Sequence, residues 1–208
     1  MATKVNTLLF YDNKAKIKFQ QFNHKQSLLP YFIPMIEGKK EVKILDIGCG
    51  LVCSIGNLAY NTKIEITASD ILADDYNAII NKHGLIPMIP VQKENMEKLS
   101  YRSDSFDIVH CVNAIDHTGD PMTAIREMIR VCIPGGFVYL RHFENVGEHE
   151  GYQGMHQWNL NYDQYDDCIF WSNKDRFSLK SINPKFRTKV GRELSIEPPT
   201  MVISILQK

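Results

Sequence analysis

The stretch VKILDIGCG at residues 42–50 decides the fold class of this chain. It begins with a short apolar run, which is typical of a strand buried on both faces, and it ends in a turn that holds Gly48 and Gly50. Glycines in such a turn allow the backbone to approach a ligand closely. The stretch therefore predicts a parallel sheet with a ligand site at the carboxyl end of its first strand.

Strand and helix patterns alternate along the chain after this stretch. Further strands are predicted at 64–69, 86–91, 105–112 and 135–142, and helices are predicted at 52–60, 72–83 and 121–131. Strand-like segments return at 168–172 and 201–206. Alternation of this kind implies right-handed crossovers between parallel strands. We therefore expect an α/β fold with a doubly wound, mostly parallel sheet.

Two further segments complete the predicted organisation. Residues 1–41 are predicted to form a helical N-terminal cap, with Phe19 and Leu28 among its packing residues. Residues 42–208 are predicted to form the main domain. Within it, the polar and aromatic segment at about 143–167 is predicted to be a long functional insertion.

The composition excludes several classes of protein. The chain has 24 basic and 24 acidic residues, and zero net charge argues against tight, non-specific binding to nucleic acid. No run reaches the roughly 18 apolar residues that span a bilayer, and no signal peptide is expected. The five cysteines are scattered without a C-x-x-C pair, which favours reduced thiols and a cytoplasmic location.

Asp70 supplies the second half of the site signal. It stands at the end of the second predicted strand, where a carboxylate can accept hydrogen bonds from both hydroxyls of a ribose. The glycine turn and Asp70 together indicate an adenosine-containing cofactor. A dinucleotide remains an alternative, although Cys53 occupies the third glycine position of its G-x-G-x-x-G motif. A simple turn, with Asp70 as a helix N-cap, is the other alternative.

An ordered set of motifs over residues 42–142 resembles the class I S-adenosylmethionine-dependent methyltransferases. The set continues after Asp70 through residues 95–99, 104–109, 116–117, 120–121, 126–131 and 134–136. The resemblance implies a Rossmann-like fold and S-adenosylmethionine as the cofactor, with S-adenosylhomocysteine as the product. The chain departs from the family pattern at Val52, where a third glycine is usual. The segment 111–114 lacks the N-P-P-Y pattern of methyltransferases that act on amino groups of DNA bases or glutamine.

A narrower resemblance concerns residues 70–76, 113–117 and 150–159. These segments are similar to a bacterial branch associated with polysaccharide and sugar biosynthesis. The likeness implies methyl transfer to a hydroxyl of a sugar, a glycan or a related small molecule. Two alternatives stay open. One is a cofactor-binding partner or regulatory protein that has lost catalysis, and the other is a methyltransferase acting on RNA or protein. The oligomeric state is left open.

The family resemblance also implies which residues contact the cofactor. Gly48 and Gly50 would line its methionine portion, and Asp70 would hold the ribose. Core packing is an equal alternative for Ile71 and Met96. Asp46 would orient the glycine loop and could meet the amino group of the cofactor, and Ile71 would lie under the adenine. Asn95 and Met96 would flank the adenine edge, and Asn113 would lie beside the methionine end. The full set of predicted cofactor residues is Asp46, Gly48, Gly50, Asp70, Ile71, Asn95, Met96 and Asn113.

The reaction would be attack of an acceptor on a sulfonium methyl group that the cofactor has already activated. The protein mainly has to align the acceptor with the methyl group, and a general base assists an alcohol nucleophile. His117 is the first candidate for this base, because it follows the fourth strand and its imidazole accepts a proton near neutral pH. Asp116 would orient His117 or act as the base itself. The alternative for His117 is a residue that only shapes the pocket.

The segment after the fifth strand is the candidate acceptor wall. His142, His156 and Trp158 are predicted to bind the acceptor, with inward packing of Trp158 as the alternative. The acids and histidines here also raise the question of a metal. No metal is expected, because the spacing of His142, Glu144, His149, Glu150 and His156 matches no helical ligand pair.

Overall fold

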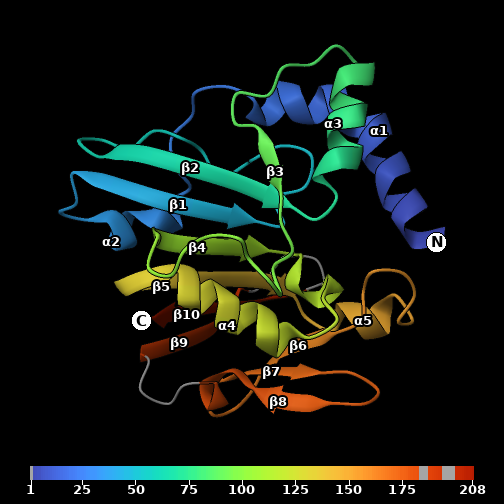
Figure 1. The fold of residues 1–208 in the computed structure, drawn as a ribbon. Helices are drawn as coiled ribbons and strands as arrows, with labels where there is room; N and C mark the ends of the chain where they lie inside the picture. Colours follow the sequence, from blue (N-terminus) through green and yellow to red (C-terminus); the bar gives the residue numbers. More distant parts are fainter. Residues whose placement is uncertain (1, 183–186, 194–199) are drawn as a thin grey trace.

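A seven-stranded sheet forms the centre of the protein (Figure 1). The computed structural model describes residues 2–182, 187–193 and 200–208. The strand order is β3-β2-β1-β4-β5-β10-β9; the first five strands run parallel, and β10 is antiparallel to both β5 and β9. This confirms the doubly wound, mostly parallel sheet. The strands are β1 (Glu41–Ile47), β2 (Lys63–Asp70), β3 (Val91–Lys93), β4 (Phe106–Val112), β5 (Cys132–Phe143), β9 (Arg187–Glu193) and β10 (Met201–Gln207).

Helices cover this sheet where the sequence places their start signals. Asp120 caps α4 by accepting a hydrogen bond from the backbone N–H of Met122 at 2.9 Å, and Pro121 occupies the first turn. The helices are α1 (Ala2–Phe22), α2 (Ile33–Ile36), α3 (Ala73–Lys82), α4 (Pro121–Val131) and α5 (Val146–His149), with short 3₁₀ turns η1 (Pro30–Phe32), η2 (Ile115–His117) and η3 (Leu179–Ser181).

The N-terminal helix packs against α3 at the side of the sheet (Figure 1). Its buried residues Ala15 and Phe19 are four positions apart, so they lie on one face of the helix. This face meets Tyr76 and Ile79 of α3. The segment 1–41 therefore carries helices, as expected. Phe32 lies in the same apolar cluster as β1, so part of this segment shares a core with the sheet. The description of the segment as a cap stays a prediction.

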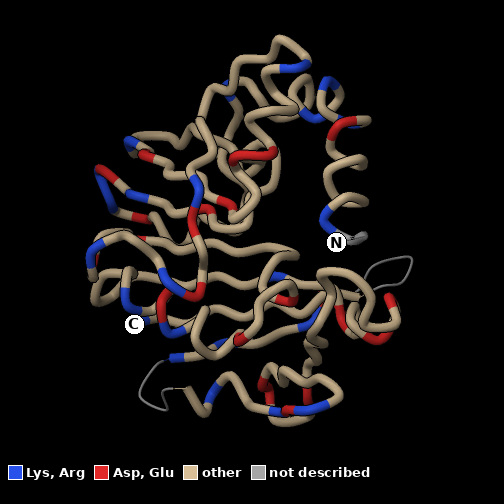
Figure 2. The backbone as a smooth tube through the Cα atoms, turned by 45° about the vertical axis from the view of Figure 1, so that its right-hand side comes forward, with Lys and Arg blue, Asp and Glu red and all other residues tan. Residues whose placement is uncertain are grey.

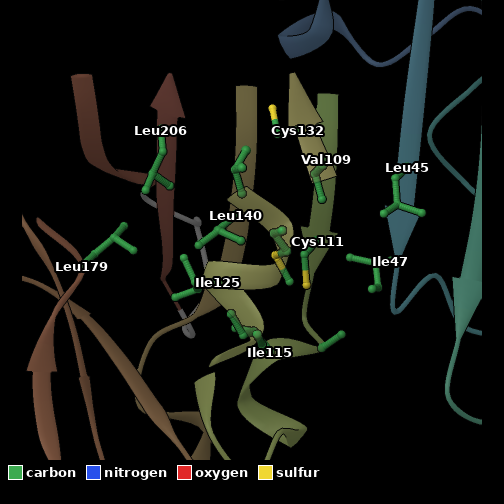
Figure 3. Close-up of a cluster of buried hydrophobic side chains, with 14 of the residues drawn as sticks. Leu45, Ile47, Val109, Cys111, Ile115, Ile125, Cys132, Leu140, Leu179 and Leu206 are labelled. Atoms are coloured by element: carbon green, nitrogen blue, oxygen red, sulfur yellow. The ribbon is translucent and has the colours of Figure 1, made fainter. Parts of the chain in front are cut away.

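The main apolar cluster lies between α4 and the sheet (Figure 3). Ile47 of β1, Cys111 of β4, Leu140 of β5 and Ile125 of α4 are fully buried in it. A small antiparallel sheet of β6 (Asn159–Tyr162), β7 (Cys168–Trp171) and β8 (Arg176–Ser178) closes the same cluster. The segment after β5 thus adds both a loop and a second sheet to the core.

The predicted helix at 52–60 is wrong. This segment instead hydrogen-bonds to the N-terminal segment: Leu28 N donates to Leu58 O at 2.8 Å, and Leu29 N donates to Ile55 O at 3.0 Å. Gly56 has a positive φ of 83°, and a side chain there would overlap the Ser27 carbonyl. The carbonyl groups of Ile55 and Leu58 find hydrogen-bond donors in this pairing, so they are satisfied without a helix.

The predicted strand at 86–91 is also displaced. Strand β3 begins only at Val91, directly after Pro90, and it ends at Lys93. Proline has no backbone N–H to donate to a neighbouring strand, and Pro87 and Pro90 therefore keep the earlier residues out of the ladder. The segment pairs with the carboxyl end of β2.

Three expectations from the composition can be compared with the described residues. No helix among them is both long enough and apolar enough to cross a membrane. Basic and acidic residues are interspersed along the backbone in the view of Figure 2, in line with the zero net charge. All five cysteines are free, and only Cys49 is not fully buried.

Candidate cofactor and acceptor site

A cavity opens at the carboxyl ends of β1, β2 and β4. This is where a doubly wound sheet binds its ligands. Six of the predicted cofactor residues line it, together with His117. The full lining, taken from the glycine turn, the loops after β2, β3 and β4, α1, α3 and the segment after α5, is Thr7, Tyr11, Ile47, Gly48, Asp70, Ile71, Leu72, Tyr76, Glu94, Asn95, Met96, Glu97, Asn113, Ala114, His117, Thr118 and Met155.

The glycine turn after β1 needs its glycines. Gly48 and Gly50 have φ values of 70° and 71°, in the left-handed region that disfavours side chains. A Cβ at Gly48 would overlap the side chain of Ala114, and a Cβ at Gly50 would overlap the Tyr11 hydroxyl. Backbone therefore lines this end of the cavity at close range.

Asp70 holds the turn from the neighbouring strand. Its Oδ2 accepts a hydrogen bond from Gly50 N at 3.0 Å, and its Oδ1 accepts one from Leu72 N at 2.9 Å. Burial raises the pKa of this carboxyl, although the backbone hydrogen bonds act in the opposite direction. Each carboxylate oxygen keeps a second lone pair, which is available to a ribose hydroxyl at the cavity.

The remaining cofactor candidates surround the same cavity. Ile71 is 50% exposed, which is unusual for an isoleucine and leaves its side chain free for a flat ring. Asn95 and Met96 follow β3 on the opposite side of the cavity. Asn113 has a φ of 49°, and its Oδ1 accepts a hydrogen bond from Phe143 N at 3.2 Å. These four residues thus lie where a nucleoside and its attached chain would be bound.

Asp46 is not among the residues that line this cavity. It is 4% exposed, and its Oδ1 accepts a hydrogen bond from His110 Nδ1 at 2.8 Å. The other ring nitrogen of His110 is 2.8 Å from the Tyr31 hydroxyl. The position of Asp46 behind the glycine turn agrees with a residue that orients this loop, and a contact with the cofactor's amino group stays a prediction. Asp46 anchors the strand that carries the glycine turn.

Asp116, His117 and His156 converge beside the cavity. His156 Nδ1 donates to Asp116 Oδ2 at 2.6 Å, and His117 Nε2 lies 3.4 Å from the same oxygen. Burial alone would raise the pKa of Asp116, but the His156 hydrogen bond and the nearby histidines hold it below its usual value. Burial lowers the pKa of His117, whereas the hydrogen bond to Asp116 raises that of His156. The group has one carboxylate and two imidazoles with different proton affinities.

The other two acceptor candidates are buried instead of lining the cavity. Trp158 is 7% exposed; its indole N–H donates to Thr118 O at 3.1 Å, and its ring packs edge-on against Phe177. The structure thus places Trp158 in the core, because the small sheet covers its apolar face. His142 is 1% exposed, and neither ring nitrogen has a hydrogen-bond partner among the described residues.

His142 predicts a specific loss of stability in acid. Burial lowers its pKa to about 4, from about 6.5 in an unfolded chain. The folded state thus holds the neutral ring. The contribution of this ring to the free energy of unfolding is complete above pH 6.5 and disappears as the pH falls towards 4. The full pKa difference corresponds to about 3 kcal/mol.

Urea unfolding at pH 7, 5.5 and 4.5 measures this loss. The difference in unfolding free energy between the wild type and His142→Leu should shrink or reverse as the pH falls, because the leucine variant lacks the titrating ring. Parallel pH dependences of the two proteins would show that His142 does not titrate in this way.

Local sequence patterns do not identify three of the residues that line the cavity. Thr7 and Tyr11 lie on α1, and Met155 lies in the segment after α5. Thr7 Oγ1 lies 3.7 Å from Met155 Sδ, so the two segments meet across the cavity. Only the packing of the N-terminal helix against α3 brings these residues to the site.

Comparison with known proteins finds similarity in the region of the chain that carries most of the cavity residues. Residues 45–140 match a family model described as a methyltransferase domain. Tocopherol O-methyltransferase of Arabidopsis thaliana is 23% identical over 164 residues, which is 73% of this chain and 47% of that protein. Ubiquinone biosynthesis O-methyltransferase of Xanthomonas oryzae is 33% identical over 104 residues, 47% of this chain and 41% of that protein. The chain spans about half the length of the curated relatives it matches.

Solved structures share the fold. A putative sarcosine dimethylglycine methyltransferase from Galdieria sulphuraria has a TM-score of 0.57 at 14% identity, covering 86% of this chain and 82% of that one. The putative methyltransferase in complex with the Trm112 activator of Haloferax volcanii has a TM-score of 0.60 at 12% identity and covers 97% and 96%. At these identities the likeness concerns the fold.

Proposed function

We propose that this chain, in which residues 45–140 match the model of a methyltransferase domain, is a class I S-adenosylmethionine-dependent methyltransferase that transfers the cofactor's methyl group to a hydroxyl oxygen of a small molecule. The observation that carries the proposal is the cavity at the strand ends. Backbone at Gly48 and the Asp70 carboxylate lie on it together with Asn113 and His117. It combines a nucleoside-binding side with a proton-accepting side.

The cofactor half of the proposal rests on three positions. Gly48 admits the methionine portion, because its backbone faces the cavity without a side chain. Asp70 binds the ribose hydroxyls, and Ile71 packs against the adenine. Asp46 supports the loop from behind, through His110. S-adenosylmethionine supplies a methyl group on a positively charged sulfur, which needs no further activation.

The acceptor half rests on His117 and Asp116. His117 lines the cavity, and Asp116 lies next to it, so this pair assists the loss of the hydroxyl proton as the new bond forms. His156 contacts both of these residues, and its side chain is 34% exposed. Two of the relatives are O-methyltransferases by name, of tocopherol and of ubiquinone biosynthesis. We propose a sugar or glycan hydroxyl as the acceptor class. A cytoplasmic location likewise stays a prediction.

Ligand binding and methyl transfer test this function. S-adenosylhomocysteine should raise the Tm of the protein, and NAD should not. Labelled methyl from S-adenosylmethionine should then pass to a member of a panel of sugars, glycans and phenols. No stabilisation by saturating cofactor would refute the proposal. Stabilisation without transfer to any acceptor, RNA and protein included, would favour a binding protein that has lost catalysis.

A further inference from the structure

Three metal-ligating atoms meet at the acceptor side of the cavity. They are Asp116 Oδ2 and His117 Nε2, both from η2, and His156 Nδ1, from the segment before β6. The three distances between them are 2.6, 3.2 and 3.4 Å. Side chains that are about 40 positions apart in sequence thus bring three ligand-type atoms within 3.4 Å of one another, and metal binding would displace the proton that His156 Nδ1 donates to Asp116.

The size of this triangle fits a single cation. The circle through the three atoms has a radius of about 1.8 Å, which is shorter than Zn–N and Zn–O bonds of about 2.0–2.2 Å. A point about 1 Å above the plane of the three atoms therefore lies at bonding distance from all of them. A cation can occupy that point without moving any of the three side chains apart.

The donor set selects the kind of cation. Two imidazole nitrogens and one carboxylate oxygen suit divalent transition metals such as Zn²⁺ or Co²⁺, whereas Mg²⁺ prefers oxygen ligands and keeps its waters. Three ligands on one side leave coordination positions open for a hydroxyl oxygen. His117 lies at the cavity wall, so the open side can be reached from the cavity.

A third histidine, His142, points to the same conclusion. His142 is completely enclosed, yet both of its ring nitrogens are unpartnered among the described residues. The next residue, Phe143, donates its backbone N–H to Asn113, three residues before Asp116. A buried imidazole without partners is costly unless a further group, such as a water on a cation, completes it.

We propose that Asp116, His117 and His156 bind one divalent transition-metal cation, which takes the acceptor hydroxyl as a further ligand. This inference rests on the proposed function and specifies how the acceptor is activated. The bound hydroxyl loses its proton to water, and its oxygen forms a bond to the methyl carbon. The sulfur–methyl bond breaks with its electron pair passing to sulfur, which gives the methyl ether and S-adenosylhomocysteine. In the metal-loaded protein His117 is therefore a ligand, in place of a direct base.

Cobalt binding to the full chain tests this site. Protein freed of metal with EDTA and then desalted should bind Co²⁺ at one site, followed by calorimetry and by visible absorption. His156→Ala and His117→Ala should each weaken the Co²⁺ affinity at least about tenfold. The matched control is His149→Ala, an exposed histidine at the end of α5 in the same segment between β5 and β6, which should leave the affinity unchanged. Excess Mg²⁺ should not displace the Co²⁺.

The outcomes separate the metal site from the methyltransferase proposal. Stabilisation by S-adenosylhomocysteine, measured on every variant, reports folding and cofactor binding without metal. If wild-type protein shows this stabilisation but no saturable Co²⁺ binding, the metal site is refuted while the proposed function stands. Equal Co²⁺ affinity in His156→Ala and the wild type would also refute the site. Binding of Co²⁺ without any response to S-adenosylhomocysteine would refute the proposed function alone.

Discussion

Asp70→Ala is expected to remove almost all stabilisation of the protein by S-adenosylhomocysteine. At about 100 times its Kd, a ligand stabilises the folded state by about 2.7 kcal/mol, which for a chain of this size raises Tm by about 5–10 °C. Loss of the two hydrogen bonds that the ribose hydroxyls donate to the carboxylate weakens affinity by about 100-fold or more. The same ligand concentration should then raise Tm by only about 1 °C.

Differential scanning fluorimetry with and without the ligand measures this effect. Asp74→Ala is the matched control, because Asp74 is an exposed acid four residues further on whose partner is Lys93 at the surface. Asp70 also accepts hydrogen bonds from two backbone N–H groups, so the Tm of the ligand-free variants must be compared first. A full response to S-adenosylhomocysteine in Asp70→Ala would contradict the assigned role.

His110→Leu is expected to destabilise the fold by about 3 kcal/mol, because it leaves the Asp46 carboxylate buried without its imidazole donor. This corresponds to a fall in Tm of about 6–12 °C. Tyr31→Phe removes only the hydroxyl from the other end of the same chain of hydrogen bonds. It should cost about 1 kcal/mol.

A double variant separates the buried charge from the lost packing. In Asp46→Leu/His110→Leu no carboxylate is left without a partner, so stability should recover part of the loss of His110→Leu alone. Urea unfolding curves of the wild type, Asp46→Leu, His110→Leu and the double variant give the free energies of unfolding. Additive effects of the two leucines would show that Asp46 and His110 do not support each other.

The sequence alone predicts the mostly parallel sheet and six of the residues that line the cavity at its edge. Both are local: the apolar run before Gly48 makes a buried strand, and the parallel arrangement of strands brings Asp70 to the same edge. The helix at 121–131 was predicted with Pro121 at its start, and the structure adds the Asp120 cap. Such features depend on neighbours within a few residues, so they can be recognised in the amino-acid sequence.

The tertiary structure alone decided the acceptor side. Nothing local shows that residues 51–62 pair with the N-terminal segment instead of forming a helix, that Trp158 turns inward, or that Tyr11 reaches Gly50. The meeting of Asp116 with His156 depends on how the segment after β5 folds back over the strand ends. Long-range packing of this kind has no period in the sequence, because its partners are set by the shape of the whole core.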